Sequence, residues 1–157
     1  MVAGADAGVH PDVASACAAL GHDPSRLSPE PDNRAHGGAI ARTPESAVRF
    51  RVGKVTPTKV GHFVTVWRRA ADGSTEPFPA EDAVETLVVA VRDGPNFGAF
   101  VFPASALIEH GIASAGGIGG KRGFRVYPPW AAAANPQARR TQQWQIGFFV
   151  ALDRLKP

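Results

Sequence analysis

The sequence has very little cysteine and no long hydrophobic run. Cys17 is the only cysteine in 157 residues, which excludes an internal disulfide, and the five scattered histidines cannot complete a zinc site with it. No apolar stretch approaches the roughly 20 residues that a membrane-spanning helix needs. No basic lead followed by an apolar core marks a secretory signal. We therefore expect a cytoplasmic protein with no membrane partner.

Acidic residues are missing from two long parts of the chain. Hydrophobic residues make up 44% and charged residues 20%, which is ordinary for a folded domain, and the net charge is only +3. The charges are nevertheless segregated, because residues 46–70 and 110–152 contain no Asp or Glu and together carry eleven Lys and Arg. If these stretches converge, they form a surface for phosphate or another polyanion. If they do not converge, these Lys and Arg residues simply lie on the solvent-exposed faces of strands and a helix.

The hydrophobic pattern predicts an α+β fold, a single domain with a central mixed or antiparallel sheet of about five strands flanked by helices. Alternation over 47–55 predicts a half-buried strand with its apolar residues on one face and Arg49 and Arg51 on the other. The apolar run over 86–92 predicts a strand buried on both faces. Further strands are expected at 62–69, 97–102 and 121–127.

Proline and glycine divide the rest of the chain. We expect a variable N-terminal segment over residues 1–28, with a short helix at 11–20, and a main domain over 29–157. A second short helix follows Pro103. The last helix is expected to begin at the N-cap Asn135 and to place three apolar side chains on the sheet at helical spacing: Trp144, Phe148 and Leu152.

Carboxylates in two places raise the possibility of a metal-dependent nuclease. Glu30 and Asp32 lie in a proline-rich segment, and Asp82 precedes the most apolar strand. With Lys54 at a strand end, such groups could hold Mg²⁺ and stabilise an attacking hydroxide. That arrangement requires the N-terminal segment to fold back over the sheet. The alternative is that these are solvated loop residues, and no metal ligand is firmly identified.

A glycine-rich run at 115–120 precedes Lys121 and Arg122. A phosphate-binding P-loop needs Ser or Thr after the lysine and a helix after the loop, and neither is present. The run can still hold a phosphate through backbone amides, or it is only a connector. Beyond it, Tyr127 and Trp130 form an aromatic corner that either caps the core or stacks on a ligand.

Four segments resemble the MepB-like proteins, an uncharacterised family of bacterial proteins, and occur in the family's order. They are FRVGKVTPTKVGHFVTVWRR (50–69), FVFP (100–103), GKRGFRVYPPW (120–130) and TQQWQ (141–145). The resemblance implies a fold like that of restriction-type endonucleases, a mixed sheet flanked by helices. It also places the family's early acidic motif on residues 30–33.

The chain departs from that pattern where cleavage would need it most. Asn33 stands where Ser is common, His36 where Tyr is usual, and His62 replaces a Gln. An endonuclease also needs a Glu two residues before its catalytic Lys, and Val52 holds that position before Lys54. The resemblance therefore favours nucleic-acid binding over cleavage.

Our leading hypothesis is a nucleic-acid-binding protein, with DNA favoured over RNA. Arginines and lysines of the two acid-free stretches would contact phosphate, and glutamines beside Trp144 could read base edges. The alternatives are a Mg²⁺-dependent nuclease and a binding module for a small anion or a regulatory partner. The expected binding residues are Arg49, Arg51, Lys54, Lys59, Arg68, Lys121, Arg122, Arg125, Tyr127, Trp130 and Gln142.

Overall fold

The computed structural model describes residues 8–153, so the outer ends of the two expected segments lie outside the described residues. Short 3-10 turns at Pro24–Arg26, Pro31–His36 and Ile146–Phe148 join regular elements. The α-helices are α1 (Pro11–Ala19), α2 (Ala104–Glu109) and α3 (Pro136–Gln145). The strands are β1 (Leu27–Pro29), β2 (Ala39–Arg42), β3 (Ala47–Val55), β4 (His62–Thr65), β5 (Trp67–Arg69), β6 (Thr75–Pro77), β7 (Thr86–Asp93), β8 (Asn96–Pro103), β9 (Gly123–Val126) and β10 (Phe149–Ala151).

A mixed sheet organises the molecule in the order β1-β2-β3-β7-β8-β10. Its central pair, β3 and β7, is parallel, and the other pairs along this path are antiparallel. Residues 87–91 of β7 are buried on both faces, as their unbroken apolar run predicted. The predicted α+β class with a central mixed sheet is confirmed.

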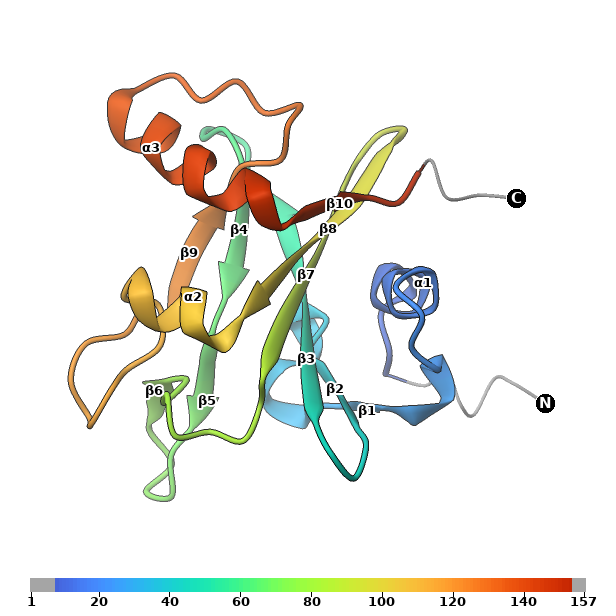
Figure 1. Cartoon of the computed structure of the whole chain (residues 1–157), viewed down its shortest axis with the longest axis vertical. Coiled ribbons are helices and arrows are strands. Elements are labelled where there is room, and N and C mark those ends of the chain that lie inside the picture. The colour runs from blue at the N-terminus through green and yellow to red at the C-terminus, as the bar shows by residue number, and fades with distance from the viewer. Residues whose placement is uncertain (1–7, 154–157) are drawn as a thin grey trace.

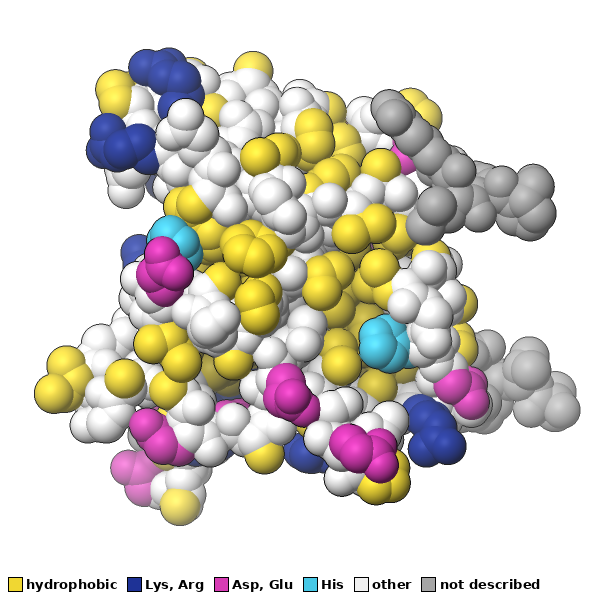
Figure 2. Space-filling model, viewed as in Figure 1, with side chains coloured by type: hydrophobic (Ala, Val, Ile, Leu, Met, Phe, Trp, Pro, Cys, Tyr) yellow, Lys and Arg dark blue, Asp and Glu magenta, His cyan; other side chains and the backbone are white. Residues whose placement is uncertain are grey.

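The sheet has a separate hydrophobic core on each face. On one face α1 covers alternate residues of β3, β7 and β8, as Figure 1 shows. On the other face the second core forms between the sheet, α2, α3 and the β4–β9 pair. Figure 2 shows hydrophobic side chains gathered near the middle of the molecule, where β7, β8 and β10 lie in Figure 1. Among residues 8–153, no helix has the length and apolar character to cross a membrane.

The sheet branches where β3 ends. Only Lys54 and Val55 of β3 pair with β4, and β4 then pairs with β9 along all four of its residues. The loop over 56–61 closes this branch, and Pro57, which has no amide hydrogen to donate, lies within it. The branch carries the β4–β9 pair away from the plane of the main sheet.

Several predicted elements differ from those found. The strand expected over 62–69 is divided at Val66 into β4 and β5. The last helix was predicted to continue to Leu152, but α3 ends at Gln145, and residues 149–151 pair with β8 as β10. Gly147 lowers the helix propensity of this part of the chain. The Phe149–Ala151 segment can instead pair with the edge of β8, and this pairing is more favourable there than a continued helix. Strands β1, β6 and β10 were not predicted, whereas β2 lies in the 34–44 stretch, which allowed a turn or a weak strand.

Strand β3 is not half-buried as predicted. Its apolar face packs under α1, while Arg49 and Arg51 on the other face are also enclosed. The exposed fraction of Arg51 is 0%, so these arginines do not face solvent. A buried guanidinium needs an anionic partner, and the structure supplies one from a distant segment.

His62 makes the stability of the fold depend on pH. Its ring is buried, with Nδ1 3.2 Å from the Gly53 carbonyl oxygen and one edge against Trp130. Burial lowers the pKa of the imidazole from its ordinary value of 6.5, and this outweighs the hydrogen bond, which acts in the opposite direction.

We expect the protein to lose stability as the pH falls below about 6.5. The unfolded chain then binds a proton at His62 that the folded protein resists, so acid favours unfolding. In His62→Gln, the melting temperature should fall less than in the wild type between about pH 7.5 and about pH 5.5. Some slope should remain, because burial also lowers the pKa of His36. Parallel profiles for the two proteins would show that His62 does not carry this dependence.

Candidate functional site

A cleft of about 620 Å³ lies beside β9, between the β4–β9 pair and α3. Its residues come from four parts of the chain: the 56–61 loop with β4, the segment after α2, strand β9 with its flanks, and α3 with the loop before it. The lining residues are Thr58, Lys59, Val60, Phe63, His110, Ile112, Lys121, Phe124, Arg125, Tyr127, Ala134, Asn135, Gln137, Ala138, Thr141 and Trp144. The volume is typical of ligand-binding clefts.

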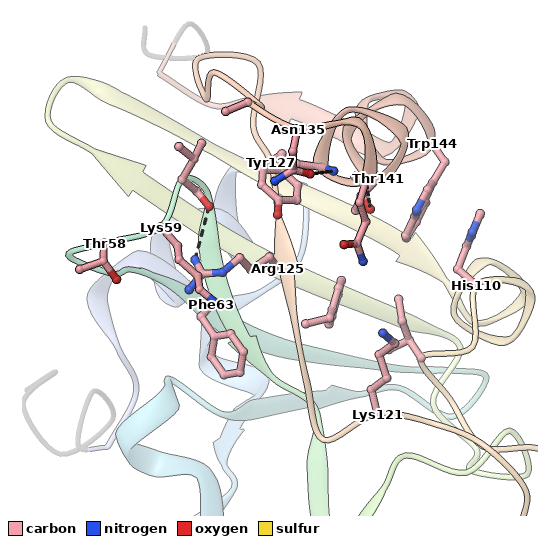
Figure 3. Close-up of a pocket in the computed structure, with 16 residues that line it drawn as sticks. Thr58, Lys59, Phe63, His110, Lys121, Arg125, Tyr127, Asn135, Thr141 and Trp144 are labelled. Atoms are coloured by element: carbon pink, nitrogen blue, oxygen red, sulfur yellow. Dashed lines mark hydrogen bonds between the residues drawn. The ribbon is translucent and has the colours of Figure 1, made fainter.

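The charge of the cleft is of one sign. Lys59, Lys121 and Arg125 line it, and no Asp or Glu does. Figure 3 shows Lys59 and Arg125 on one side and Lys121 with His110 on the other. The hydrogen bonds that Arg125 makes within residues 8–153 are long, with Nη1 3.4 Å from the Val60 carbonyl oxygen and 3.5 Å from that of Gly61. Its remaining N–H groups are free to bind an anion.

Two glutamines of α3 attach the helix to β9 and so form the cleft. Gln145 is fully buried, accepts a hydrogen bond from the Tyr127 amide at 2.8 Å and donates to the Arg125 carbonyl oxygen at 2.9 Å. Its side-chain amide therefore replaces a neighbouring strand at the edge of β9. Gln142 Nε2 donates to the carbonyl oxygens of Pro128 and Ala131 at 2.9 and 3.0 Å and holds the loop before α3.

Aromatic rings give the cleft apolar surfaces beside its charges. Trp144 on α3 stacks on His110, with ring centroids 3.7 Å apart and planes 6° apart. Phe63 is the most exposed ring in the cleft, at 40%. Asn135 caps α3, its Oδ1 accepting a hydrogen bond from the Ala138 amide at 2.8 Å, as the sequence predicted. The cleft thus combines cations, ring faces and polar groups.

Two of the predicted catalytic carboxylates, Glu30 and Asp82, lie elsewhere, in an ion-pair network beneath β3. Arg49 Nε is 3.2 Å from Glu30 Oε2, and its Nη1 is 3.3 Å from Asp82 Oδ2. Arg51 Nη1 pairs with the other oxygen of Glu30. Burial lowers the pKa of the Arg51 guanidinium, and the Glu30 carboxylate opposes this shift. The N-terminal segment does fold back over the sheet, but its carboxylate neutralises arginines.

The other carboxylate and the lysine of the nuclease hypothesis do not join this network. Asp32 is paired weakly with Arg69, at 3.7 Å, on the surface. Lys54 is exposed at the end of β3, in register with Phe63 of β4. Within residues 8–153, no three His, Cys, Asp or Glu side chains are placed to hold a metal ion.

The structure brings together four of the predicted binding residues: Lys59, Lys121, Arg125 and Tyr127. Of the other predicted residues, Arg49 and Arg51 are buried in the network. Gln142 holds the loop, and Trp130 packs edge-on against His62 and Phe149. Arg68 pairs with Glu76 at 2.7 Å across the β5–β6 hairpin, and Arg122 donates to the Thr75 carbonyl oxygen at 2.8 Å.

Sequence reasoning missed several residues of the cleft. His110 and Trp144 were interpreted as parts of helices, and Asn135 only as a helix cap. Phe63 was expected only as part of the strand at 62–69, without a role. The signal that would have identified Phe63 is the pairing of β4 with β9, which no local pattern encodes.

The fold and cleft define the protein as a single-domain α+β protein with a basic cleft at a branch of its sheet. A sequence model of proteins described as MepB-like matches residues 30–151. A crystal structure of MepB is similar, with a TM-score of 0.76 and 34% sequence identity over 80% of this chain and 84% of that one. The chain belongs to the MepB-like family, which confirms the resemblance. No curated protein matches the chain significantly.

The ion-pair network predicts a structural role for Glu30. Replacing Glu30 with Gln leaves the buried Arg51 without a charged partner and should lower the free energy of unfolding by about 3 kcal/mol. Asp32→Asn, which breaks only a surface pair, should cost less than about 0.5 kcal/mol. Urea unfolding of both variants measures the difference. Equal stability of the two variants would contradict the structural role.

Proposed function

We propose that the protein binds nucleic acid in the cleft along β9. The observation that carries the proposal is the presence of three cations, with no carboxylate, beside exposed and partly exposed rings. Such cations bind phosphate groups, and aromatic rings stack on nucleobases. An inorganic anion would contact the cations but not the rings. DNA as the ligand is consistent with these cations and rings. A cytoplasmic location is consistent with the single cysteine of the sequence.

The distribution of charge supports an extended ligand over a small anion. Lys59 and Lys121 belong to different parts of the chain and lie on opposite sides of β9 (Figure 3). In Figure 2, basic side chains lie at the end of the molecule that carries α3, while most acidic ones in that view lie toward the opposite end, together with further basic side chains. The α3 end therefore shows few acidic side chains in this view, which favours the approach of a polyanion there.

Cleavage is a separate hypothesis with less support. Glu30 and Asp82 are engaged by arginines of β3, away from the residues that line the cleft. An endonuclease-like fold is compatible with a protein that binds without cutting. Incubating a labelled substrate with Mg²⁺ tests cleavage directly, and a product abolished by Asp82→Asn would revive the nuclease hypothesis.

The proposal predicts salt-dependent binding that depends on two lysines. In the double variant Lys59→Ala/Lys121→Ala, affinity for labelled DNA at about 50 mM salt should fall about tenfold or more. The slope of log affinity against log salt should become shallower by about 1.4 to 1.8, because each phosphate contact contributes about 0.7 to 0.9. Fluorescence anisotropy with DNA and RNA at several salt concentrations measures both quantities.

Arg42→Ala is the matched control for this experiment. Arg42 is an exposed cation paired with the first residue of β3, whereas the cleft lies beyond the last. Its removal should leave affinity and slope close to those of the wild type. An unchanged slope in the double lysine variant would remove the cleft from the proposal, and absence of binding even at low salt would overturn it.

A further inference from the structure

His110 lines the cleft with its ring stacked on Trp144. It is the residue at which α2 ends, and its imidazole lies parallel to the indole, with ring centroids 3.7 Å apart and planes 6° apart. Its side chain is 28% exposed. Because the two nitrogens of an imidazole lie at the edge of the ring, a stack on one face leaves both of them able to bond with a ligand. The stack therefore holds the ring in the cleft without using its polar atoms.

Charges of both signs lie around His110. Glu109 of the same helix is on the solvent side, with Oε2 3.9 Å from His110 Nε2 and a side chain that is 76% exposed. Lys121 lies on the same side of the cleft as His110, and Lys59 and Arg125 lie on the other (Figure 3). Among the described residues, those of α3 that line the cleft carry no charge. An exposed carboxylate attracts a cation only weakly, so pH and any bound anion govern the charge of this imidazole.

Protonation changes what His110 offers to a ligand. A histidine side chain changes its charge between about pH 5 and pH 8, whereas Lys and Arg keep theirs throughout this range. The protonated ring is a fourth cation in the cleft and donates from both nitrogens. An indole face attracts a cation, so protonation need not disrupt the stack on Trp144. A phosphate beside the ring favours the proton, and by reciprocal linkage the proton favours the phosphate.

We propose that His110 is a further binding residue of the cleft, and that its protonation tightens the binding of nucleic acid as the pH falls from about 7.5 to about 5.5. This inference rests on the proposed binding of nucleic acid in the cleft. It adds a fourth phosphate-binding side chain and a dependence on pH. The two lysines and the arginine of the cleft cannot supply that dependence, because they stay charged.

The test measures affinity at the two ends of this pH range. The probes are a labelled oligothymidylate and its duplex with oligoadenylate, because their phosphates and bases keep the same charge throughout. By fluorescence anisotropy at about 50 mM salt, the wild type should bind about fivefold or more tightly at the lower pH. The slope of log affinity against log salt should be steeper there by about 0.7 to 0.9, the contribution of one phosphate contact. In His110→Phe, which keeps a ring on Trp144 but takes no proton, both differences should largely disappear.

Two further variants separate charge from the other properties of the ring. In His110→Arg the guanidinium can stack on the indole and stays charged, so the affinity and slope at both pH values should resemble those of the wild type at the lower pH. His22→Gln is the matched control, because His22 is exposed, contacts Phe50 and is not among the described residues that line the cleft. It should keep the wild-type dependence on pH.

The outcomes distinguish this inference from the proposed function. Melting temperatures at both pH values establish that each variant is folded, since acid destabilises the protein through His62. If the wild type gains no affinity at the lower pH, or if His110→Phe keeps the gain, the inference is wrong and the proposed function stands. If neither probe binds at either pH, the proposed function itself fails.

Nuclear magnetic resonance gives a second measurement that does not depend on affinity. The ring signals of His110, assigned by their loss in His110→Phe, should shift as the pH is lowered. The midpoint of this shift should move to higher pH when oligothymidylate is bound, because a neighbouring phosphate favours the proton. A midpoint that does not move on binding would contradict the contact between His110 and phosphate.

Discussion

The ion pairs between Glu30 and two arginines of β3 are the constraint on which the fold depends. Arg49 and Arg51 project from a central strand into the protein, where a guanidinium without an anion would be very unfavourable. Glu30 supplies that anion from a segment that precedes β3 by many residues, and so ties the N-terminal part of the chain to the sheet. The same charges that raised a nuclease hypothesis are therefore used to hold two segments together.

The structure separates its charges into two groups with different surroundings. The arginines of β3 are enclosed and neutralised, and Arg49 also lies 4.0 Å over the Phe78 ring. Lys59 and Lys121 are exposed and line a cleft that has no carboxylate. Because unpaired exposed cations keep their long-range field and neutralised ones lose it, the second group can attract a polyanion and the first cannot.

Local sequence patterns predicted the elements that bury continuous apolar surface. The apolar run of β7, the alternation of β3 and the Asn135 cap of α3 were all found where expected, because each is determined by neighbouring residues. Strand β10 was missed because residues 149–151 form a strand only through pairing with β8. The family resemblance was also correct.

The candidate site could be predicted only in part, since its members are assembled by tertiary pairing. The acid-free stretches identified Lys59, Lys121 and Arg125, because charge is visible along the chain. The burial of Arg51 was not visible, since alternation predicts an outward charge unless its partner is known. The contact between Phe63 and Gly123 depends on the register of β4 against β9, which sequence spacing does not reveal.

The capping of β9 by Gln145 has a consequence for solubility. A strand with one free edge beside an open cleft offers backbone groups that could recruit an extended segment of another chain and start aggregation. Gln145 occupies the amide of Tyr127 and the carbonyl of Arg125, the groups that such a segment would need first. These two backbone groups are therefore unavailable to an incoming strand, while side chains of β9 still line the cleft.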